Sequence, residues 1–303
     1  MRLIICDPTD ASAIETMRAA GIEVDVRDTI TLEELETVIA DYHIMVVRSR
    51  TTVRAPLIDK ATNLKAVIRG GVGVDNIDVA YAESKGIEVR NTPAASSNSV
   101  AELTIGYLFA LARQIPQVTA TMKDGKWEKK AFSKGSELAG KTLGIVGCGR
   151  IGAMVGEKAA ALGMAVLGYD PFIAEMASCI LKEEDLDEIF ARSDFITVHV
   201  PHTDGTHYIL DAAAFAKMKD GVYIVNCGRG GTVDEAALCD ALASGKVAGA
   251  ALDVFEDEKV ERGQRLMAFP QVIGSPHIGA GTREATARVG GEVAQIAIEI
   301  ARR

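Results

Sequence analysis

The sequence predicts an α/β protein with two doubly wound, parallel sheets. Short apolar runs alternate with amphipathic segments along the whole chain, and this alternation is typical of parallel sheets covered by helices on both faces. The 303 residues are enough for two domains with substantial cores. A glycine-rich turn after a strand in the middle of the chain distinguishes the second half from the first.

The first half of the chain, to about residue 90, consists of alternating β and α units. Between its apolar runs lie helical patterns such as Thr9–Ala20 and Leu32–Ala40. Thr31 and Glu34 stand in capping-box positions at the start of the second of these helices. This half has no glycine-rich phosphate-binding motif, so we expect a substrate domain. The expected strands are Leu3–Cys6, Ile22–Val26, Ile44–Val47, Ala66–Ile68 and Ile87–Val89.

Arginines follow two of these strands. Arg48 and Arg50 come just after one strand. Arg69 stands at the end of another, before Gly70 and Gly71. Ligands of open α/β sheets bind beyond the carboxyl ends of the strands, and guanidinium groups beside glycine-exposed N–H groups suit a carboxylate or a phosphate. A solvated surface arginine is the alternative for any one of the three taken alone.

A boundary follows near Pro93. The small polar residues 94–99 are typical of a loop, and a long apolar helix is expected from about Val100 to Arg113. The polar, lysine-rich stretch from Met122 to Leu138 contains the single tryptophan of the chain. It suits an arm between domains or a dimer contact better than a core element.

The most specific motif lies between Lys141 and Asp170. An apolar run is followed by glycines in the G-x-G-x-x-G spacing, a helical pattern and a second apolar run. Such glycines allow a tight turn, a close approach of backbone N–H groups to a pyrophosphate and close packing of helix on strand. The helix start adds a partial positive charge. These features favour a Rossmann-type dinucleotide site over an ordinary tight turn. The glycines are Gly147, Gly149 and Gly152, the strands Thr142–Val146 and Ala165–Tyr169, and the helix Ile151–Leu162.

Asp170 selects between cofactors. It ends the second strand of the motif, about 20 residues after the glycines, where a carboxylate accepts hydrogen bonds from the adenosine ribose. A carboxylate repels the additional phosphate of NADP, and Pro171 and Phe172 follow in place of an arginine. We therefore expect NAD as the cofactor.

Three residues beyond later strands can do chemistry: Arg229, Glu258 and His277. In a doubly wound sheet their loops converge on the cofactor edge. A histidine–carboxylate pair transfers a proton, and an arginine holds the carboxylate of a 2-keto acid. With a nicotinamide, the three groups suffice to reduce a 2-keto acid or oxidise a 2-hydroxy acid. The expected strands are Phe195–Val200, Val222–Asn226, Ala248–Val254 and Val272–Ser275, and the expected helices are Glu184–Arg192, Ala212–Met218, Asp234–Ser244 and Thr282–Arg302.

Other residues compete for these roles on pattern alone. His199 ends a strand and could face the cofactor, whereas His202 and His207 lie in a polar loop. The position of His277 in the loop after the last expected strand favours it for the acid–base role, and the other histidines remain alternatives. Cys227 has no base in its loop and is expected to be a small buried thiol. The remaining competitors are His43 among the histidines and Glu256, Asp257 and Glu261 beside Glu258.

Composition and charge disfavour several classes of function. A net charge of -9 argues against nucleic acid or an anionic membrane as the partner. Five cysteines without CxxC pairs indicate reduced thiols, and no metal site is expected. The start of the chain does not resemble a signal peptide, and no apolar run is long enough to span a bilayer. We therefore expect a soluble, cytoplasmic protein.

Ten short motifs occur in order along nearly the whole chain: VRSRT, GVGVDNIDVA, NTP, AELT, GKTLGIVGCGRIG, GYDP, DFITVHVP, VNCGRGGTVDE, GAALDVFEDE and SPHIGA. Their set resembles the D-isomer-specific 2-hydroxyacid dehydrogenases. The resemblance implies a homodimer whose subunits have a Rossmann-type NAD domain at 96–282 and a flavodoxin-like substrate domain at 1–95 plus 283–303. It is strongest to members that oxidise D-3-phosphoglycerate to 3-phosphohydroxypyruvate with NAD, the first step of phosphorylated serine biosynthesis.

The resemblance also assigns roles to residues. It implies that Arg229, Glu258 and His277 are catalytic, and so chooses among the competing acids and histidines. The implied cofactor contacts are Gly147, Gly149, Arg150, Ile151, Gly152, Asp170, Val200, Pro201, Thr206, Cys227, Gly228, Asp253, Gly279 and Ala280. The implied contacts to the substrate anion are Arg48, Arg50, Arg69, Gly70, Gly71 and Val72.

The chain departs from the family pattern at the lip of the expected site. Lys259 follows Glu258 where many relatives have proline, and Gly281 stands where serine is frequent. We expect no serine-sensing domain after the last helix, and therefore no inhibition by serine through such a domain. The alternatives are the same chemistry on a 2-keto acid without phosphate (hydroxypyruvate, glyoxylate or the pyruvate/D-lactate pair) and, in another class, an NAD-sensing corepressor. A corepressor is expected to have peptide-binding grooves and long disordered tails, and we expect no such tails in this protein.

Overall fold

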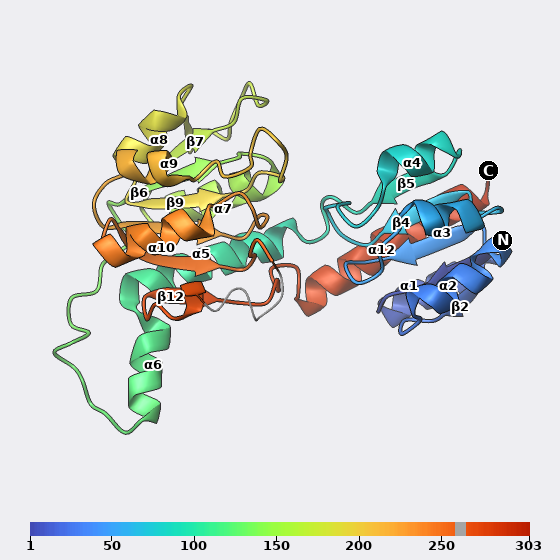
Figure 1. Ribbon diagram of the computed structural model, residues 1–303, viewed down its shortest axis with the longest axis horizontal. Helices are drawn as coiled ribbons and strands as arrows, with labels where there is room; N and C mark the ends of the chain where they lie inside the picture. Colours follow the sequence, from blue (N-terminus) through green and yellow to red (C-terminus); the bar gives the residue numbers. More distant parts are fainter. Residues whose placement is uncertain (258–264) are drawn as a thin grey trace. The chain divides into compact units, whose positions relative to one another are not determined.

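The computed structural model describes residues 1–257 and 265–303, and the chain forms two compact units. Unit 1 comprises Met1–Ser96 together with Ala280–Arg303, and unit 2 comprises Ser97–Gly279. Each unit contains a parallel sheet with helices packed on both faces (Figure 1). The predicted fold class, α/β with two doubly wound sheets, is confirmed.

Unit 1 contains five parallel strands in the order β2-β1-β3-β4-β5. The strands are short apolar runs, and successive side chains point to opposite faces of the sheet. Leu3 and Ile5 therefore pack into one helix layer and Ile4 into the other. The strand bounds are β1 (Arg2–Ile5), β2 (Glu23–Val26), β3 (Ile44–Val47), β4 (Ala66–Arg69) and β5 (Glu88–Asn91).

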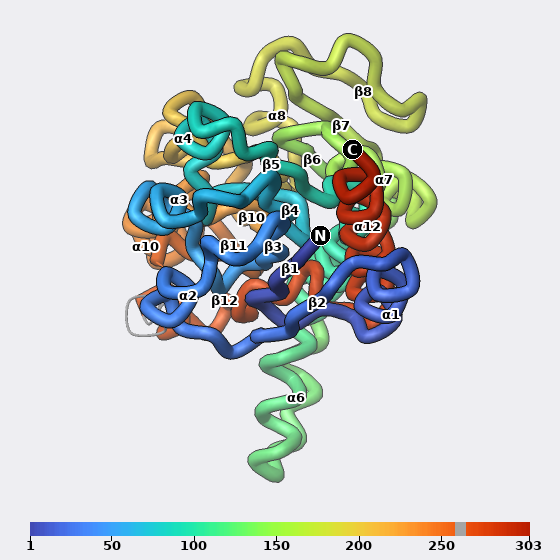
Figure 2. Tube along the Cα trace, turned by 90° about the vertical axis from the view of Figure 1, so that its right-hand side faces the viewer, coloured from blue at the N-terminus to red at the C-terminus, as the bar shows by residue number. Residues whose placement is uncertain are grey.

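The two helix layers of unit 1 come from different parts of the chain. One face of the sheet is covered by α1 (Ala11–Ala19) and by α12 (Arg283–Ala301), which lie side by side although they are distant in sequence (Figure 2). The helices of the other face include α2, whose predicted capping box is confirmed by bonds between Thr31 and Glu34. The elements of this face are α2 (Leu32–Val38), the 3₁₀ turn η1 (Ile39–Asp41), α3 (Ala55–Lys60) and α4 (Val79–Ser84).

Unit 2 contains seven parallel strands in the order β12-β11-β10-β9-β6-β7-β8. The order of the chain reverses between β6 and β9, where open sheets bind ligands beyond the carboxyl ends of the strands. The strand bounds are β6 (Thr142–Val146), β7 (Ala165–Tyr169), β8 (Leu181–Lys182), β9 (Phe195–Val198), β10 (Val222–Asn226), β11 (Val247–Leu252) and β12 (Val272–Gly274).

The helices of unit 2 pack on both faces of its sheet. One core holds side chains of α5 and α7, and the other holds side chains of α8, α9 and α10. A further helix, α6, contributes no buried residue and stands away from the rest of its unit (Figure 2). The helix bounds are α5 (Ser97–Arg113), α6 (Ile115–Lys123), α7 (Arg150–Ala161), α8 (Leu186–Arg192), α9 (Ala212–Lys217) and α10 (Glu235–Ser244).

The structure differs from the sequence prediction at several elements. The sequence predicts a loop at residues 94–99, but α5 begins at Ser97, and Ser97 and Ser99 are buried in its first turns. The short helices α3 and α4, the exposed helix α6 and the two-residue edge strand β8 were not predicted, because none carries a long periodic apolar pattern. Within the described residues, no helix is both long and apolar enough to cross a bilayer.

Candidate active site

The functional candidates of unit 2 follow the carboxyl ends of its strands. Because the strands are parallel and adjacent, the loops after β12, β11, β10, β9, β6 and β7 lie next to one another along one edge of the sheet. His277 follows β12, Asp253 follows β11 and Arg229 follows β10. The glycine loop follows β6, and Asp170 follows β7.

The glycine loop is tightly packed against the sheet at two of its three glycines. Gly147 has a φ of +92°, and its N–H donates to Tyr169 O at 2.9 Å. A Cβ on Gly152 would lie 2.1 Å from the carbonyl oxygen of Gly147, so only glycine lets α7 approach the turn this closely. A Cβ on Gly149, by contrast, would meet no atom within 4 Å.

The start of α7 fits the pyrophosphate of a dinucleotide. Its N-cap is Gly149, and no side chain caps the first turn, which leaves backbone N–H groups available at the helix start. Arg150 and Ile151, both predicted cofactor contacts, are the first two residues of the helix. The open space beside Gly149 and the uncapped N–H groups together match what a bound phosphate requires.

Asp170 stands at the end of β7, beside the glycine loop. One of its carboxylate oxygens accepts the N–H of Cys148 at 2.9 Å, and the other accepts the N–H of Phe172 at 3.0 Å. These bonds orient the carboxylate, and each oxygen keeps a lone pair that can accept from a ribose hydroxyl. The arrangement suits NAD.

The loop after β9 carries further predicted cofactor contacts. Thr206 closes it, because its hydroxyl donates to Pro201 O at 2.5 Å and accepts the N–H of Thr203 at 2.9 Å. Val200 borders the glycine loop, since its Cγ1 would lie 2.8 Å from a Cβ on Gly147. The loop therefore lies directly beside the turn that follows β6.

Asn226, at the end of β10, shapes the loop that carries Arg229. Its side chain is buried, accepts the N–H of Gly228 at 3.0 Å and donates to Arg229 O at 3.0 Å. Arg229 Nη1 donates to Gly228 O at 2.8 Å. Sequence reasoning did not single out Asn226, although an amide at the end of an apolar strand is a signal that could have identified it.

The loops after β11 and β12 are joined through Asp253. The N–H of His277 donates to Asp253 O at 2.8 Å, and His277 has a φ of +55°. Gly279 donates its N–H to the Asp253 carboxylate at 2.7 Å. Ala280, the last predicted cofactor contact, begins the second segment of unit 1.

The competing histidines have different surroundings. Burial lowers the pKa of His199 to about 4, so its ring is neutral at physiological pH, and its Nε2 lies 3.0 Å from the hydroxyl of Thr197. His43 belongs to unit 1 and accepts the N–H of Arg2 at 3.1 Å. The remaining pair, His202 and His207, is exposed, with ring nitrogens 3.0 Å apart. None of the four follows β12.

The acidic partner expected for His277 lies outside the described residues, which end at residue 257 and resume at residue 265. This applies to Glu258 and also to its competitor Glu261. Glu256, another competitor, accepts the N–H of Glu235 at 3.0 Å at the start of α10. Burial raises the pKa of Cys227 to about 12, so this thiol stays protonated, as expected of a small buried residue.

In unit 1, Asp7 organises the loop after β3. Its buried carboxylate accepts the N–H groups of Arg48 at 2.5 Å and Thr51 at 3.3 Å, and the hydroxyl of Thr51 at 3.0 Å. It also pairs with Arg50, whose Nε lies 2.9 Å away. The Arg50 guanidinium is about half exposed and has five N–H donors, so it can bind a further anion.

The loop after the neighbouring strand β4 holds the third arginine. A Cβ on Gly71 would lie 1.6 Å from Nη1 of Arg69, so the guanidinium rests on a glycine that leaves it room. Gly70 donates its N–H to Val47 O at 2.8 Å, and Asn91 donates to Val72 O at 2.5 Å. The structure thus brings the predicted anion contacts to the carboxyl ends of two adjacent strands.

Comparison with known proteins places these features in a family. Residues 105–279 match the family described as D-isomer specific 2-hydroxyacid dehydrogenase, NAD binding domain. The chain is 49% identical to the D-3-phosphoglycerate dehydrogenase of Methanocaldococcus jannaschii over 97% of its own length and 56% of that protein. It is 47% identical to the hydroxypyruvate reductase of Thermotoga maritima over 97% of its own length and 96% of that protein.

A solved structure agrees with these matches. The D-lactate dehydrogenase of Aquifex aeolicus, complexed with NAD and lactic acid, superposes with a TM-score of 0.86 at 28% identity, covering 100% of this chain and 96% of that one. The chain spans little more than half the length of the first curated relatives it matches, at 56% and 58%. The predicted cofactor, NAD, is confirmed by the family match. The chain belongs to the D-isomer specific 2-hydroxyacid dehydrogenases.

Proposed function

We propose that the protein oxidises D-3-phosphoglycerate to 3-phosphohydroxypyruvate with NAD, the first step of phosphorylated serine biosynthesis. The observation that carries this proposal is the placement of Arg229 and His277 after β10 and β12, the two strands that flank β11 in the sheet whose glycine loop suits NAD. Relatives named D-3-phosphoglycerate dehydrogenase, such as that of Methanocaldococcus jannaschii, support the choice of substrate.

The residues have separate tasks in the reaction. His277 takes the proton of the C2 hydroxyl, and in the reverse direction it donates that proton. Arg229 binds the substrate carboxylate through its guanidinium and orients C2. When bound, the nicotinamide supplies the acceptor for the C2 hydride. Glu258, which the resemblance pairs with His277, would stabilise the imidazolium.

The phosphate of the substrate is assigned to the arginines of unit 1. Asp7 orients the loop of Arg48 and Arg50, and Gly71 makes room for Arg69. Guanidinium groups bind phosphate with charge-assisted hydrogen bonds, which contribute about 1.5–3 kcal/mol each. These residues therefore supply the selectivity for a phosphorylated acid.

A second candidate is reduction of hydroxypyruvate. The observation that favours it is the hydroxypyruvate reductase of Thermotoga maritima, which this chain matches over 96% of that protein's length. Both reactions use the same acid–base and hydride chemistry. They differ in whether the substrate carries a phosphate that the arginines of unit 1 can bind.

The experiment compares NADH formation from D-3-phosphoglycerate, glycerate and D-lactate with NADH consumption by hydroxypyruvate. D-3-phosphoglycerate should give the highest kcat/KM. Arg50→Ala should raise its KM about tenfold or more, with a much smaller effect on hydroxypyruvate. Arg27→Ala, which removes another paired arginine of unit 1, is the control. Equal effects of Arg50→Ala on both substrates would favour the second candidate.

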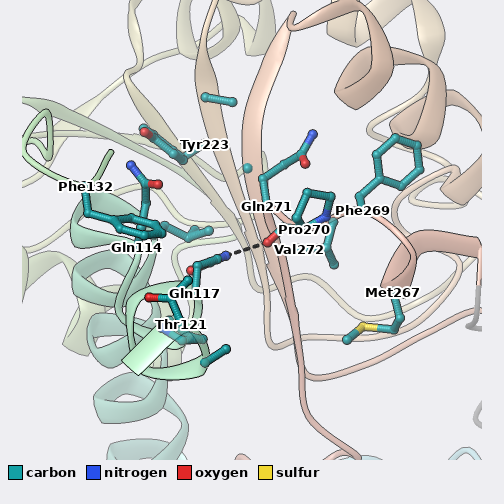
Figure 3. A pocket seen from close by; sticks show the side chains of 15 residues that line it. Gln114, Gln117, Thr121, Phe132, Tyr223, Met267, Phe269, Pro270, Gln271 and Val272 are labelled. Carbon is teal, nitrogen blue, oxygen red and sulfur yellow. Dashed lines mark hydrogen bonds between the residues drawn. The ribbon is translucent and has the colours of Figure 1, made fainter. Parts of the chain in front are cut away.

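We also propose a homodimer in the cytoplasm. All five cysteines carry free thiols, which suits a reducing compartment. For the dimer, the support is a groove of about 720 Å³ in unit 2, lined mainly by the end of α5, α6 and the amino ends of β11 and β12 (Figure 3). Gln117 Nε2 donates to Pro270 O across it at 2.7 Å.

The position of this groove suits a subunit contact better than catalysis. It lies at the amino ends of β11 and β12, whereas Asp253 and His277 follow their carboxyl ends. Large apolar side chains are exposed around it, and apolar patches of this kind mark interaction surfaces. They are Ile115 and Met122 on α6 and Met267 in the lining of the groove. We propose that a second copy of the chain covers them.

A further inference from the structure

A chain of hydrogen bonds runs from α5 to the loop that carries His277. Tyr107 lies on α5 and is buried, and its hydroxyl bonds to the hydroxyl of Ser275. Ser275 Oγ also bonds to Oδ1 of Asp253, whose side chain is buried. Three segments of unit 2 distant in sequence, represented by Tyr107, Asp253 and Ser275, therefore share one polar network.

The direction of donation in this network follows from the chemistry of its members. An ionised carboxylate only accepts hydrogen bonds, so the single hydroxyl hydrogen of Ser275 points to Asp253. Tyr107 must then donate to Ser275 Oγ. Burial raises the pKa of Tyr107 to about 12, so the phenol keeps its proton at physiological pH. The order of donors is Tyr107, Ser275, Asp253.

Asp253 uses its acceptors to hold the residues around His277. Its carboxylate accepts the N–H of Ile278 at 2.8 Å and the N–H of Gly279 at 2.7 Å. Its main-chain oxygen accepts the N–H of His277 at 2.8 Å. The N–H groups of three consecutive residues therefore all donate to Asp253.

His277 itself has an unusual backbone conformation. Its φ of +55° lies in the left-handed region, which few residues other than glycine occupy. A residue persists there only when its surroundings impose the conformation. The three bonds to Asp253 do so, and they set the direction in which the imidazole leaves the loop.

We propose that Tyr107 and Ser275 are positioning residues, which act through Asp253 to hold the His277 imidazole in its reactive place. The inference rests on the proposed role of His277 in proton transfer. Neither hydroxyl reaches the reacting atoms in this assignment. If Ser275 no longer donates, the Asp253 carboxylate loses one of its three donors, and the loop of His277 is held less firmly.

A purely structural role makes a different prediction. Tyr107 and Ser275 would then only satisfy each other's hydroxyl groups, and their removal would lower the melting temperature without changing turnover. A positioning role lowers kcat, since a small displacement of a catalytic group slows the reaction by up to about a hundredfold. It leaves the KM of the substrate nearly unchanged.

The test measures kcat and KM for Tyr107→Phe, Ser275→Ala and the double variant. We expect a clear loss of kcat in Ser275→Ala, a smaller loss in Tyr107→Phe, and rescue by Ser275→Thr, which restores the hydroxyl. Because Tyr107 acts through Ser275, the double variant should match Ser275→Ala alone. Tyr42→Phe removes a tyrosine hydroxyl that bonds to Asp25 in unit 1, and it is the matched control.

An unchanged kcat in Ser275→Ala would overturn the proposal, and so would additive effects in the double variant. Amide hydrogen exchange of Ile278 and Gly279 gives a readout that needs no substrate, and it should be faster in Ser275→Ala than in the control. If the wild-type chain turned over no 2-hydroxy acid, the proposed function would fail. The exchange rates would then decide, since unchanged rates would refute the coupling between Ser275 and the loop.

Discussion

Buried polar side chains at strand ends decide where the reactive groups lie. Asp7 holds the loop of Arg50, Asn226 holds the loop of Arg229, and Asp253 holds the loop of His277. Each of these three residues is 1% or 2% exposed. Because a buried carboxylate or amide must be hydrogen bonded, each fixes a loop at the carboxyl end of its sheet. Asn226 holds the loop after its own strand, whereas Asp7 and Asp253 hold the loop after a neighbouring strand.

Burial of His199 makes the stability of the protein depend on pH. Its pKa is about 4 in the folded chain, against 6.5 ordinarily. Between these values the unfolded chain binds a proton that the folded chain does not, so stability falls as the pH drops through this window. A shift of this size corresponds to about 3 kcal/mol of unfolding free energy.

Melting temperatures of the wild type and His199→Asn between about pH 7 and pH 4.5 test this expectation. The wild-type curve should fall more steeply towards acid, because the variant has lost the group that gains a proton on unfolding. The variant loses the bond to Thr197 at every pH, which shifts its curve without changing the slope. Parallel curves would show that His199 does not titrate in this way.

Individual site residues were predictable from the sequence only where position along a strand determines them. His277 and Arg229 follow expected strands, so their loops could be assigned to one edge of the sheet. The contacts of Asn226 and the bond between Tyr107 and Ser275 could not be predicted, because they depend on strand register and helix rotation. Glu258 lies outside the described residues.

At the scale of elements, the turn between β6 and α7 uses its glycines for different purposes. Gly152 lets the helix approach the strand, whereas Gly149 faces open space at the helix start. Gly149 has a φ of -64°, which any residue adopts. Alanine at these two positions should therefore have opposite consequences.

We expect Gly152→Ala to lower stability by about 1–3 kcal/mol, because its Cβ would overlap the Gly147 carbonyl. Gly149→Ala should keep the wild-type melting temperature but weaken NAD binding about tenfold or more, since it displaces a phosphate from the N–H groups. Thermal unfolding and calorimetric titration with NAD measure both effects. Gly291→Ala on α12, where a Cβ meets nothing within 4 Å, is the control.

The strands were the most predictable elements. Residues 44–47, 142–146, 165–169 and 222–226 form strands with the expected bounds, because a continuous apolar run between turn residues suits a strand buried on both faces. α6 could not be predicted in this way. Its apolar residues recur as Ile115, Val118 and Met122, but over 9 residues this pattern is too short to distinguish a helix from a polar arm, and none of these side chains is buried.

At the scale of the whole molecule, the proposed dimer explains why α6 keeps apolar residues at its surface. Ala120 is exposed on α6 and lines the groove, so an arginine there should block a second copy. We expect Ala120→Arg to convert the dimer to a monomer, which light scattering after gel filtration measures. The monomeric variant should still unfold in a cooperative thermal transition. Thr119→Arg, exposed on the same helix but outside the groove lining, is the matched control.

Disruption of the dimer by both arginine variants would point to general damage to α6. A wild-type chain that elutes as a monomer would refute the assignment of the groove to a second copy. The fold class, the family and NAD were all predictable from the sequence, because they depend on the order of motifs along the chain. The proposed subunit contact could not be predicted in this way, because the groove is formed by segments that are distant in sequence.

The proposed reaction depends on His277, which takes the proton of the substrate hydroxyl. The most direct measurement is kcat for D-3-phosphoglycerate oxidation by His277→Asn, with NAD binding measured on the same sample. Asparagine is chosen because it accepts the left-handed conformation of this residue, where φ is +55°. We expect kcat to fall by about a hundredfold to ten-thousandfold while NAD affinity is retained. Turnover at the wild-type rate would contradict this role of His277.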